Sequence, residues 1–428
     1  MWMALTAVLA VAAFADDVAM FRGGPAHPGV TSDQAPREFH RVKWKFPTGG
    51  RIYSSPVTAN GLIYFGGDDS NVYAVDAETG VQKWMTTTGG PVNSTPAVVD
   101  GNLYVVSFDG RLYCLDALTG DIKWKFATEG ERRFEAKGIH GFKPRNQTFP
   151  DLFDTFLSSP AVVDGVVYFG CGDGNIYAVN GSDGELKWKF KTNDVVHSSP
   201  AVAGGIVYAG SWDSYFYAID AATGALKWKF QGGEDPVIHN QVGFQSSPTV
   251  KDGIVYTGCR DSNLYALDAL TGKEVFRSNN QGSWVIVTPA VVGDTLLYGT
   301  SDSRVVRAMD AKTGKDKYLE KAQGFIFSSP TVAGDVIVHG TFAGTLEARD
   351  LATGKLLWSF RTDGAKQNPF WALTPTGDMN TQFVFNTQYF YLEATVKEFA
   401  PGVVFSTPLV SKGVVYFGST DGNMYAID

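Results

Sequence analysis

The chain has 428 residues, a formal net charge of -8 and 48 glycines, with 44% hydrophobic, 13% aromatic and 19% charged residues. This composition is typical of a turn-rich, aromatic-rich globular protein, and it excludes a disordered or fibrous chain. The acidic balance contains no basic block, so nucleic acid is not expected as a partner.

The N-terminal residues 1–15 are predicted to be a secretory signal peptide. They carry no charged side chain, are apolar from Leu5 to Phe14, and end in Ala13-Phe14-Ala15 before two aspartates, which is the pattern of an A-x-A cleavage site. No later stretch has the ~18–20 apolar residues that a membrane helix needs. We therefore expect a periplasmic or secreted protein without a transmembrane segment, in which residues 16–41 form an N-terminal extension.

A Ser/Thr-Pro signature recurs along the rest of the chain and defines an internal repeat. The prolines of the eight signatures are Pro56, Pro96, Pro160, Pro200, Pro248, Pro289, Pro330 and Pro408. Each unit continues with short apolar runs separated by glycine-containing turns, such as Val166 to Gly170 after Asp164-Gly165. Such turns between alternating runs predict hairpins. Four antiparallel strands in ~40 residues form one blade of a β-propeller.

The eighth unit ends at Asp428, one strand short of the others. The run from Val42 to Phe46 precedes the first signature and copies the last run of another unit, Leu186 to Phe190. We infer that this N-terminal strand completes the C-terminal blade and removes the open sheet edge. The prediction is therefore all-β: a single eight-bladed propeller of four-stranded antiparallel blades over residues 42–428.

The repeat resembles that of the pyrroloquinoline quinone (PQQ)-like propeller family. The run from Asp220 to Trp228 is similar to the tryptophan-docking motif of that family, in which the outer-strand Trp packs against the next blade. The slot is filled, in chain order, by Trp44, Trp84, Trp124, Trp188, Trp228, Phe276, Tyr318 and Trp358. Within this family the chain is similar to the BamB outer-membrane assembly factors, and it is not a close match to the quinoprotein alcohol dehydrogenases. The resemblance implies a fold, whereas propellers carry many unrelated functions.

Comparing the eight units with one another separates scaffold residues from candidates for function. The three cysteines, Cys114, Cys171 and Cys259, fill positions where other units have small residues, so we expect them to be buried and unpaired. Seven units share an aspartate in the turn after the second strand, and we expect it to stabilise that turn. The aspartates are Asp69, Asp109, Asp173, Asp213, Asp261, Asp302 and Asp421.

The loops on one face of the ring break the repeat. They carry insertions near residues 130–157, 231–245 and 363–405. Long loops gathered on one face of a rigid scaffold usually bind or catalyse, although they can also plug the channel. The candidate residues of this binding face are Trp212, Arg260, His239, Asn240, Trp284, Phe342, Phe370, Trp371, Arg132, Arg133, His140 and His197. The histidines lack the spacing of a zinc site, so no metal site and no catalytic residue are assigned.

Three functions follow as hypotheses. The first is a non-catalytic, monomeric scaffold of the cell envelope that docks a protein or peptide on the loop face through aromatic anchors, without a cofactor. The second is a quinoprotein dehydrogenase with PQQ and calcium at the channel mouth. Members of that kind carry a vicinal cysteine pair, and this chain has no adjacent cysteines. The third is a propeller that binds or cleaves carbohydrate.

Overall fold

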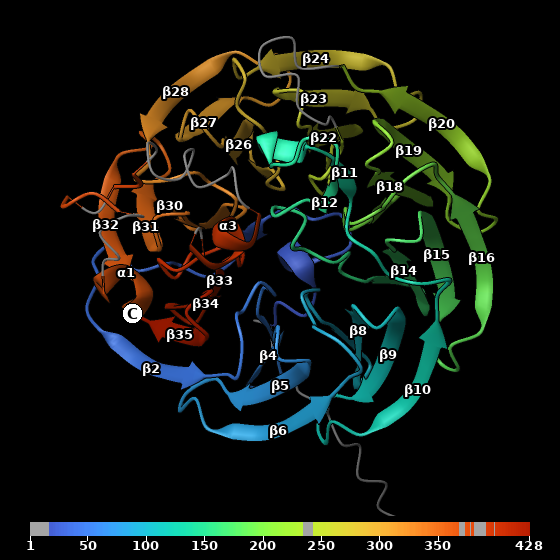
Figure 1. Ribbon diagram of the computed structural model, residues 1–428, viewed down its shortest axis with the longest axis horizontal. Helices are drawn as coiled ribbons and strands as arrows, with labels where there is room; N and C mark the ends of the chain where they lie inside the picture. The colour runs from blue at the N-terminus through green and yellow to red at the C-terminus, as the bar shows by residue number, and fades with distance from the viewer. Residues whose placement is uncertain (1–16, 234–242, 368–372, 377, 381–390, 398) are drawn as a thin grey trace, which may run out of the picture.

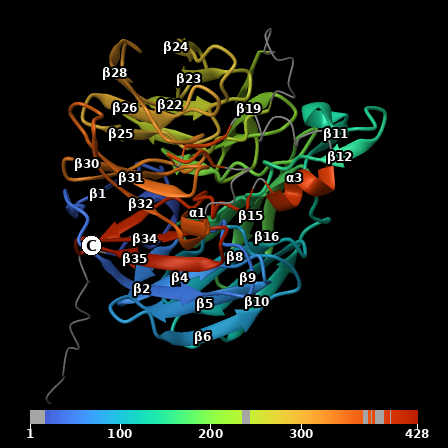
Figure 2. The ribbon, with the colours of Figure 1, turned by 60° about the vertical axis from the view of Figure 1, so that its left-hand side comes forward.

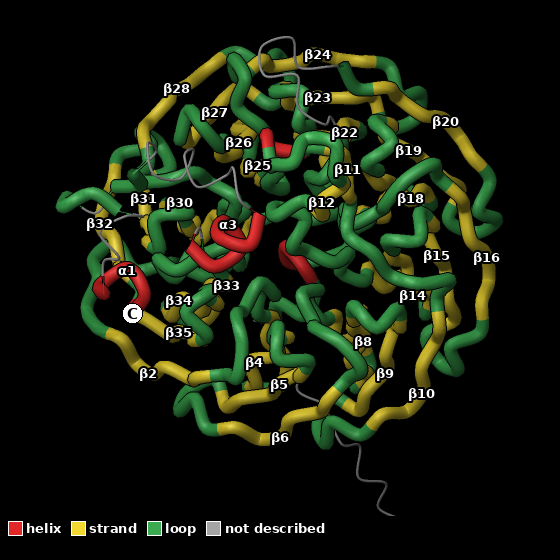
Figure 3. Tube along the Cα trace, viewed as in Figure 1, coloured by secondary structure: helices red, strands yellow, loops and turns green. Residues whose placement is uncertain are grey.

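Eight β-sheets arranged as blades around a central axis form the molecule, as Figure 1 shows in a computed structural model. The structure describes residues 17–233, 243–367, 373–376, 378–380, 391–397 and 399–428. In each blade four antiparallel strands run outward from the axis, and the tube in Figure 3 shows that strands and loops make up nearly all of the described chain. The predicted eight-bladed, all-β propeller is confirmed.

Blades 1 to 4 come from the first half of the chain. Blade 1 contains β3 (Val57–Ala59), β4 (Leu62–Gly66), β5 (Asn71–Asp76) and β6 (Gln82–Thr87). Blade 2 contains β7 (Ala97–Val99), β8 (Asn102–Ser107), β9 (Arg111–Asp116) and β10 (Ile122–Ala127). Blade 3 contains β13 (Ala161–Val163), β14 (Val166–Gly170), β15 (Asn175–Asn180) and β16 (Leu186–Lys191). Blade 4 contains β17 (Ala201–Ala203), β18 (Ile206–Gly210), β19 (Tyr215–Asp220) and β20 (Leu226–Gln231).

Blades 5 to 8 complete the ring. Blade 5 contains β21 (Thr249–Lys251), β22 (Ile254–Gly258), β23 (Asn263–Asp268) and β24 (Glu274–Asn279). Blade 6 contains β25 (Ala290–Val292), β26 (Thr295–Gly299), β27 (Val305–Asp310) and β28 (Asp316–Lys321). Blade 7 contains β29 (Thr331–Ala333), β30 (Val336–Gly340), β31 (Thr345–Asp350) and β32 (Leu356–Arg361). Blade 8 contains β33 (Leu409–Ser411), β34 (Val414–Gly418), β35 (Asn423–Ile427) and the N-terminal strand β2 (Val42–Pro47).

The ring closes where the two ends of the chain pair in blade 8. Strand β2 is antiparallel to β35, with Trp44 opposite Ala426 and Phe46 opposite Met424. On the axis, the backbone N–H of Thr407 donates to Ser55 Oγ at 2.9 Å, which joins blade 8 to blade 1. The predicted closure by the N-terminal strand is confirmed, and β2 covers the edge of β35 that would otherwise be unpaired.

The signature hydroxyls explain why every unit carries Ser or Thr before its proline. Ser159 N donates to Ser199 Oγ at 2.9 Å, and Ser199 N donates to Ser247 Oγ at 2.8 Å, so each blade is tied to the next. These residues are buried beside the axis, where an unpaired amide would cost about 1–3 kcal/mol. The signature therefore forms a hydrogen-bonded belt around the channel.

The outer strands join neighbouring blades through their aromatic slot. The indole N–H of Trp188 donates to the carbonyl of Ala221 in blade 4 at 2.9 Å, and the Trp84 indole does the same to Ala117 in blade 2 at 3.0 Å. The motif glycine is required there, because a Cβ on Gly224, whose φ is +74°, would lie 2.8 Å from the Trp188 ring. The hydrophobic core consequently lies between blades, as in the cluster of Tyr168, Trp188 and Ile219.

Six of the seven repeated aspartates stabilise their turns, as expected, whereas Asp302 of blade 6 accepts from the hydroxyl of its neighbour Ser301 at 2.7 Å. Asp69 accepts from the N–H of Asn71 at 3.3 Å, from the hydroxyl of Tyr73 at 2.6 Å and from the N–H of Gly49 in the preceding linker at 2.8 Å. The same tyrosine bond recurs at Asp109, Asp173, Asp213, Asp261 and Asp421. Burial and the carboxylate raise the pKa of the Tyr113 hydroxyl to about 12, so it stays a donor. These carboxylates belong to the scaffold.

Blade 7 breaks this pattern and repairs it with other residues. Ala343 stands at the aspartate position and Glu347 at the tyrosine position. The Glu347 carboxylate accepts the linker N–H of Gln323 at 3.0 Å and is held by the Arg349 guanidinium at 2.5 Å. The tie between blades 6 and 7 is therefore kept with an acid from β31.

The cysteines are buried and form no disulfide, as expected. Burial raises the pKa of the Cys114 thiol to about 11, and it raises the pKa values of the Cys171 and Cys259 thiols as well. Neutral thiols packed in a core behave as small hydrophobic side chains.

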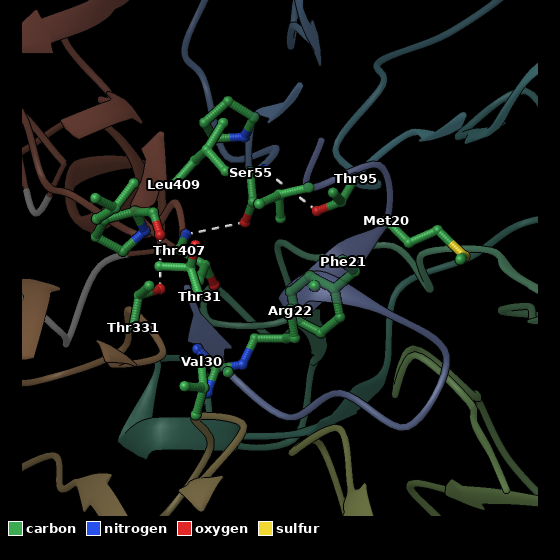
Figure 4. A pocket seen from close by; sticks show the side chains of 16 residues that line it. Met20, Phe21, Arg22, Val30, Thr31, Ser55, Thr95, Thr331, Thr407 and Leu409 are labelled. Atoms are coloured by element: carbon green, nitrogen blue, oxygen red, sulfur yellow. Dashed lines mark hydrogen bonds between the residues drawn. The ribbon is translucent and has the colours of Figure 1, made fainter. Parts of the chain in front are cut away.

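Residues 17–35, which we call the N-terminal strap, run across the channel end that lies opposite the long insertions. The strap contains the short helix η1 (Phe21–Gly23) and strand β1 (Val30–Thr31), and β1 pairs in parallel with β29 as a fifth strand of blade 7. Strap carbonyls accept the N–H of the second residue of six innermost strands, namely Thr58, Val98, Val202, Val250, Val291 and Val332. Figure 4 shows Phe21 and Arg22 of the strap beside the signature residues Ser55, Thr95 and Thr407. Arg22 is buried and donates to the carbonyls of Pro330 at 2.5 Å and Pro289 at 3.1 Å.

Two further helices belong to the third insertion, α1 (Asp363–Gln367) and α3 (Tyr391–Lys397). In the described part of the chain, no helix is both long and apolar enough to cross a membrane.

Candidate functional site

The first insertion, residues 130–157, covers one end of the central channel. Its strands β11 (Glu135–Lys137) and β12 (Thr148–Pro150) form an antiparallel pair around the short helix η2 (Ile139–Gly141). Figures 1 and 2 show β11, β12 and α3 gathered on one face of the ring. The Tyr391 ring of α3 packs against Phe142 and Phe149 at 5.3 and 5.5 Å.

Beneath this insertion lies the channel mouth, which is formed by the residues that precede the eight signatures. These residues are Tyr53, Asn93, Leu157, His197, Gln245, Ile286, Phe327 and Phe405. All eight are buried. The polar members belong to blades 2, 4 and 5, and the aromatic members to blades 1, 7 and 8, so the mouth has a polar and an apolar sector.

An aromatic layer joins the insertion to the mouth. The Phe134 ring stacks on Trp212 at 4.2 Å with an interplanar angle of 3°. Phe153 packs against Trp284 at 5.9 Å and against Phe327 at 5.6 Å. These rings belong to one buried cluster. Rings at such separations add about 0.5–1.5 kcal/mol per pair beyond the area they bury, so the insertion is packed as part of the core.

Arg260, in the turn between β22 and β23, lies at the centre of this layer. Its guanidinium carbon is 4.3 Å from the centroid of the Trp212 ring and 4.2 Å from that of Trp284. Nη1 donates to Asp151 at 2.5 Å and Nε donates to Gln245 Oε1 at 2.9 Å. The side chain has no exposed surface, and a buried guanidinium needs such compensation. In the described part of the chain, its Nη2 and the indole Nε1 atoms of Trp212 and Trp284 are buried without a hydrogen-bond partner.

Asp151 connects the guanidinium to His140, whose Nε2 is 3.1 Å from the other carboxylate oxygen. Burial alone raises the pKa of Asp151, but the charges of Arg260 and His140 outweigh burial and hold this pKa below its usual range. The carboxylate is therefore ionised at neutral pH and forms a buried ion pair with blade 5.

His197 makes the second charged connection to the insertion. Its Nδ1 is 2.7 Å from Asp154 and its Nε2 is 3.0 Å from Glu131. Burial lowers the pKa of the imidazole, but the two carboxylates outweigh burial and raise it to about 10. The buried thiol of Cys171 faces the other oxygen of Glu131 at 3.3 Å, and the Phe108 ring lies edge-on to the imidazole. At neutral pH the site thus holds an imidazolium between two acids.

This pKa predicts a loss of stability at alkaline pH. Unfolded histidine titrates near 6.5 and His197 titrates near 10 in the folded protein, so its contribution is complete below about pH 6.5 and is lost as pH rises toward 10. We expect the difference in melting temperature between the wild type and His197→Gln to narrow over this range. A difference that stays constant with pH would contradict the assignment.

The structure brings together six of the sequence candidates and buries them. Trp212, Arg260, Trp284, Phe342, His140 and His197 all lie under the first insertion or within it. Trp212 and Phe342 are not open to solvent, because the insertion's own Phe134 and Phe153 cover them.

The other candidates lie elsewhere. Arg132 is exposed and pairs with Asp194 at 2.8 Å. The Arg133 guanidinium lies over the Phe108 ring at 5.4 Å. His239, Asn240, Phe370 and Trp371 lie outside the described residues. Sequence reasoning missed the acids Glu131, Asp151 and Asp154, and the signal for two of them was an apolar run, Phe149 to Phe156, that is interrupted by two aspartates.

The central channel keeps a cavity between the two coverings. Its walls include Phe156 of the insertion, Phe21 of the strap and the signature hydroxyls of Ser55, Ser159 and Ser199. A second cavity lies beside the strap and is lined by Arg22, Val30 and Leu409 among others (Figure 4).

Comparison with known proteins places the chain in one family. The family profile described as "Outer membrane protein assembly factor BamB" matches residues 33–140, 141–283 and 260–388. A BamB of Shewanella oneidensis is 34% identical over 91 residues, which is 20% of this chain and 23% of that protein. The chain thus matches about a quarter of the length of that relative.

Solved structures share the fold. The crystal structure of BamB from Moraxella catarrhalis aligns with a TM-score of 0.66 at 16% identity, covering 91% of this chain and 99% of the other. The quinohemoprotein alcohol dehydrogenase of Comamonas testosteroni aligns with a TM-score of 0.68 at 17% identity, covering 96% of this chain and 80% of the other. At these identities the alignments show the propeller architecture alone.

The fold shared with quinoproteins raises the question whether the mouth fits PQQ. A planar quinone needs an aromatic face to stack on, and in this chain the two sides of the Trp212 ring are taken by Phe134 and Arg260. No vicinal cysteine pair exists in the sequence. Within the described residues, no group of three or more His, Cys, Asp or Glu side chains is arranged to hold a metal ion. The residues at the mouth do not fit PQQ with calcium.

Proposed function

The chain belongs to the family of the outer membrane protein assembly factor BamB, and from this premise we propose that it is a non-catalytic scaffold of the cell envelope that docks protein partners on the face bearing the insertions. The family membership carries the proposal. The match over residues 33–388 covers most of the ring, and a relative described as an assembly factor points to binding rather than to turnover. We also propose that residues 1–15 direct export and are removed.

The exposed side of the first insertion supports docking to an acidic surface. Arg132, Lys137 and Arg145 are exposed on it, whereas its acids Glu131, Asp151 and Asp154 point inward to His197 and Arg260. The fold thus turns three of the four acids of this segment toward the ring, with Glu135 as its exposed acid, and leaves the basic residues Arg132, Lys137 and Arg145 exposed to solvent. Charges at the rim of an interface steer association.

Charge reversal on this surface tests the proposal. In the organism that encodes the protein, we expect it in the envelope fraction, where it is captured with proteins of the outer-membrane assembly machinery. Lys137→Glu with Arg145→Glu should reduce this capture several-fold, since a repelled partner associates more slowly. The matched control is Lys312→Glu with Lys355→Glu, in exposed turns between the third and fourth strands of blades 6 and 7.

Two results would count against the proposed function. One is recovery of the protein from the cytoplasm. The other is equal capture by the two charge-reversed variants, which would mean that the first insertion does not contribute to docking.

A further inference from the structure

Residues 151–156 of the first insertion lie in the channel mouth in the way a bound peptide would, and they lead directly into Leu157, the mouth residue of blade 3. This segment, Asp-Leu-Phe-Asp-Thr-Phe, belongs to no strand or helix. Four side chains of the ring contact it through hydrogen bonds or ion pairs. Arg260 binds the Asp151 carboxylate at 2.5 Å, and Gln245 Nε2 donates to the Phe153 carbonyl at 2.6 Å. His197 binds the Asp154 carboxylate at 2.7 Å, and Asn93 Nδ2 donates to the Thr155 carbonyl at 2.8 Å.

The apolar sector of the mouth holds the aromatic side chains of the same segment. Phe153 contacts Phe327 and Phe342 at centroid distances of 5.6 and 6.2 Å. Phe156 contacts Phe405 at 5.7 Å. The polar sector of the ring thus meets the acids and carbonyls of the segment, and the aromatic sector meets its phenylalanines. The mouth is complementary to a peptide in which acidic and aromatic residues alternate.

The segment leaves part of this site unused. Three buried N–H donors around Arg260 have no hydrogen-bond partner among the residues that the structure describes: its own Nη2 and the indole nitrogens of Trp212 and Trp284. An unsatisfied buried donor costs about 1–3 kcal/mol, and such groups are rare in native structures. A ligand with additional carboxylate oxygens would satisfy donors that Asp151 leaves free. The imidazolium and the guanidinium at the mouth also favour an acidic ligand.

We propose that the channel mouth is a binding site for acidic, aromatic peptide segments and that residues 151–156 occupy it in cis. A partner peptide binds by displacing them. The inference deepens the proposed function and rests on it, because peptide capture is one way in which a scaffold holds its partner. The attached segment competes with the partner peptide at an effective concentration in the millimolar range. The apparent affinity of the wild type for a peptide is therefore reduced in proportion to the small fraction of molecules in which the segment has left the mouth.

Fluorescence anisotropy with a labelled synthetic peptide Asp-Leu-Phe-Asp-Thr-Phe tests the site in the full chain. Asp151→Asn with Asp154→Asn weakens the cis segment and leaves the ring side intact. We expect this variant to bind the peptide at least about tenfold more tightly than the wild type, because the peptide supplies the two carboxylates that the segment has lost. The peptide Asn-Leu-Phe-Asn-Thr-Phe should bind at least about tenfold more weakly to the same variant.

The matched control is Asp100→Asn with Asp164→Asn, which makes the same charge change at two exposed hairpin turns and should leave peptide binding at the wild-type level. Should the double variant at residues 151 and 154 not fold, Phe134→Ala serves instead. It removes the ring stacked on Trp212 and leaves every buried charge paired.

Equal affinity of wild type and folded variant, or equal affinity of the acidic and amide peptides, would overturn the proposal. If neither the wild type nor the variant binds the peptide but the protein still captures envelope partners, this inference is overturned and the proposed function stands. If the variant binds the peptide as expected but the protein captures no envelope partner, the proposed function is overturned and the peptide site stands.

Discussion

Replacing Arg260 with methionine is expected to lower the free energy of unfolding by about 3–5 kcal/mol, which is the usual cost of breaking a buried ion pair from one side. Methionine keeps an apolar side chain in place of the aliphatic part of Arg260, and it removes the charge together with the hydrogen bonds to Asp151 and Gln245. It leaves the carboxylate of Asp151, which has no exposed surface, with the His140 imidazole as its remaining side-chain partner among the described residues. It also removes the cation between the rings of Trp212 and Trp284. Urea unfolding measures the effect as a lower midpoint.

Arg132→Met is the matched control for this variant. Arg132 lies in the first insertion and pairs with Asp194, but its side chain is 49% exposed. Exposed pairs of this kind contribute about 0–1 kcal/mol. Equal effects of the two substitutions would mean that the buried pair does not hold the insertion on the ring.

Removing strand β2 is expected to abolish the closed ring. A chain that begins at Thr48 lacks Trp44, whose indole donates to the Ala77 carbonyl of blade 1 at 3.0 Å, and it exposes β35 as an unpaired edge. Loss of a buried Trp alone costs about 3–5 kcal/mol, and an open edge promotes association between chains. We expect oligomers or aggregates in size-exclusion chromatography.

A chain that begins at Val42 separates closure from the strap. It keeps β2 and loses residues 17–35, so six innermost strands lose the carbonyls that accept their N–H groups. We expect a monomer of lower melting temperature than the full chain. If the chain that begins at Thr48 is monomeric and has the same melting temperature as the chain that begins at Val42, the role of β2 in closing the ring is refuted.

The ring could be predicted from sequence because its determinants repeat. The signature residues, the aspartate turns and the aromatic slot each recur in most units, so a single departure did not hide the pattern. Glu347 in blade 7 illustrates the limit. Its position predicts a tyrosine, and only the structure shows that an acid there accepts the linker N–H of Gln323.

The organisation of the mouth could be predicted only in part. The variable residues before the signatures correctly indicated the channel mouth. The acidic partners of Arg260 and His197, however, lie in the first insertion, which has no counterpart in the other units, so comparison between units could not identify them. Whether Trp212 faces solvent or Phe134 depends on how that insertion folds back. The strap left no signal, because its bonds to the innermost strands use backbone atoms that every residue type carries.

The closure of blade 8 also determines when the protein can fold. Strand β2 is made before the other three strands of blade 8, so it waits for β35 until the seven blades between them have been synthesised, and the strap has no complete ring to bind before then. Pairings between distant parts of a chain are slow, because the entropy of closing a long loop is lost before the contacts are gained. For a chain that we propose is exported, this order delays closure of the ring until β35 has crossed the membrane. Until then the earlier blades depend on their own hairpins, and the pairing of β35 with β2 completes the ring.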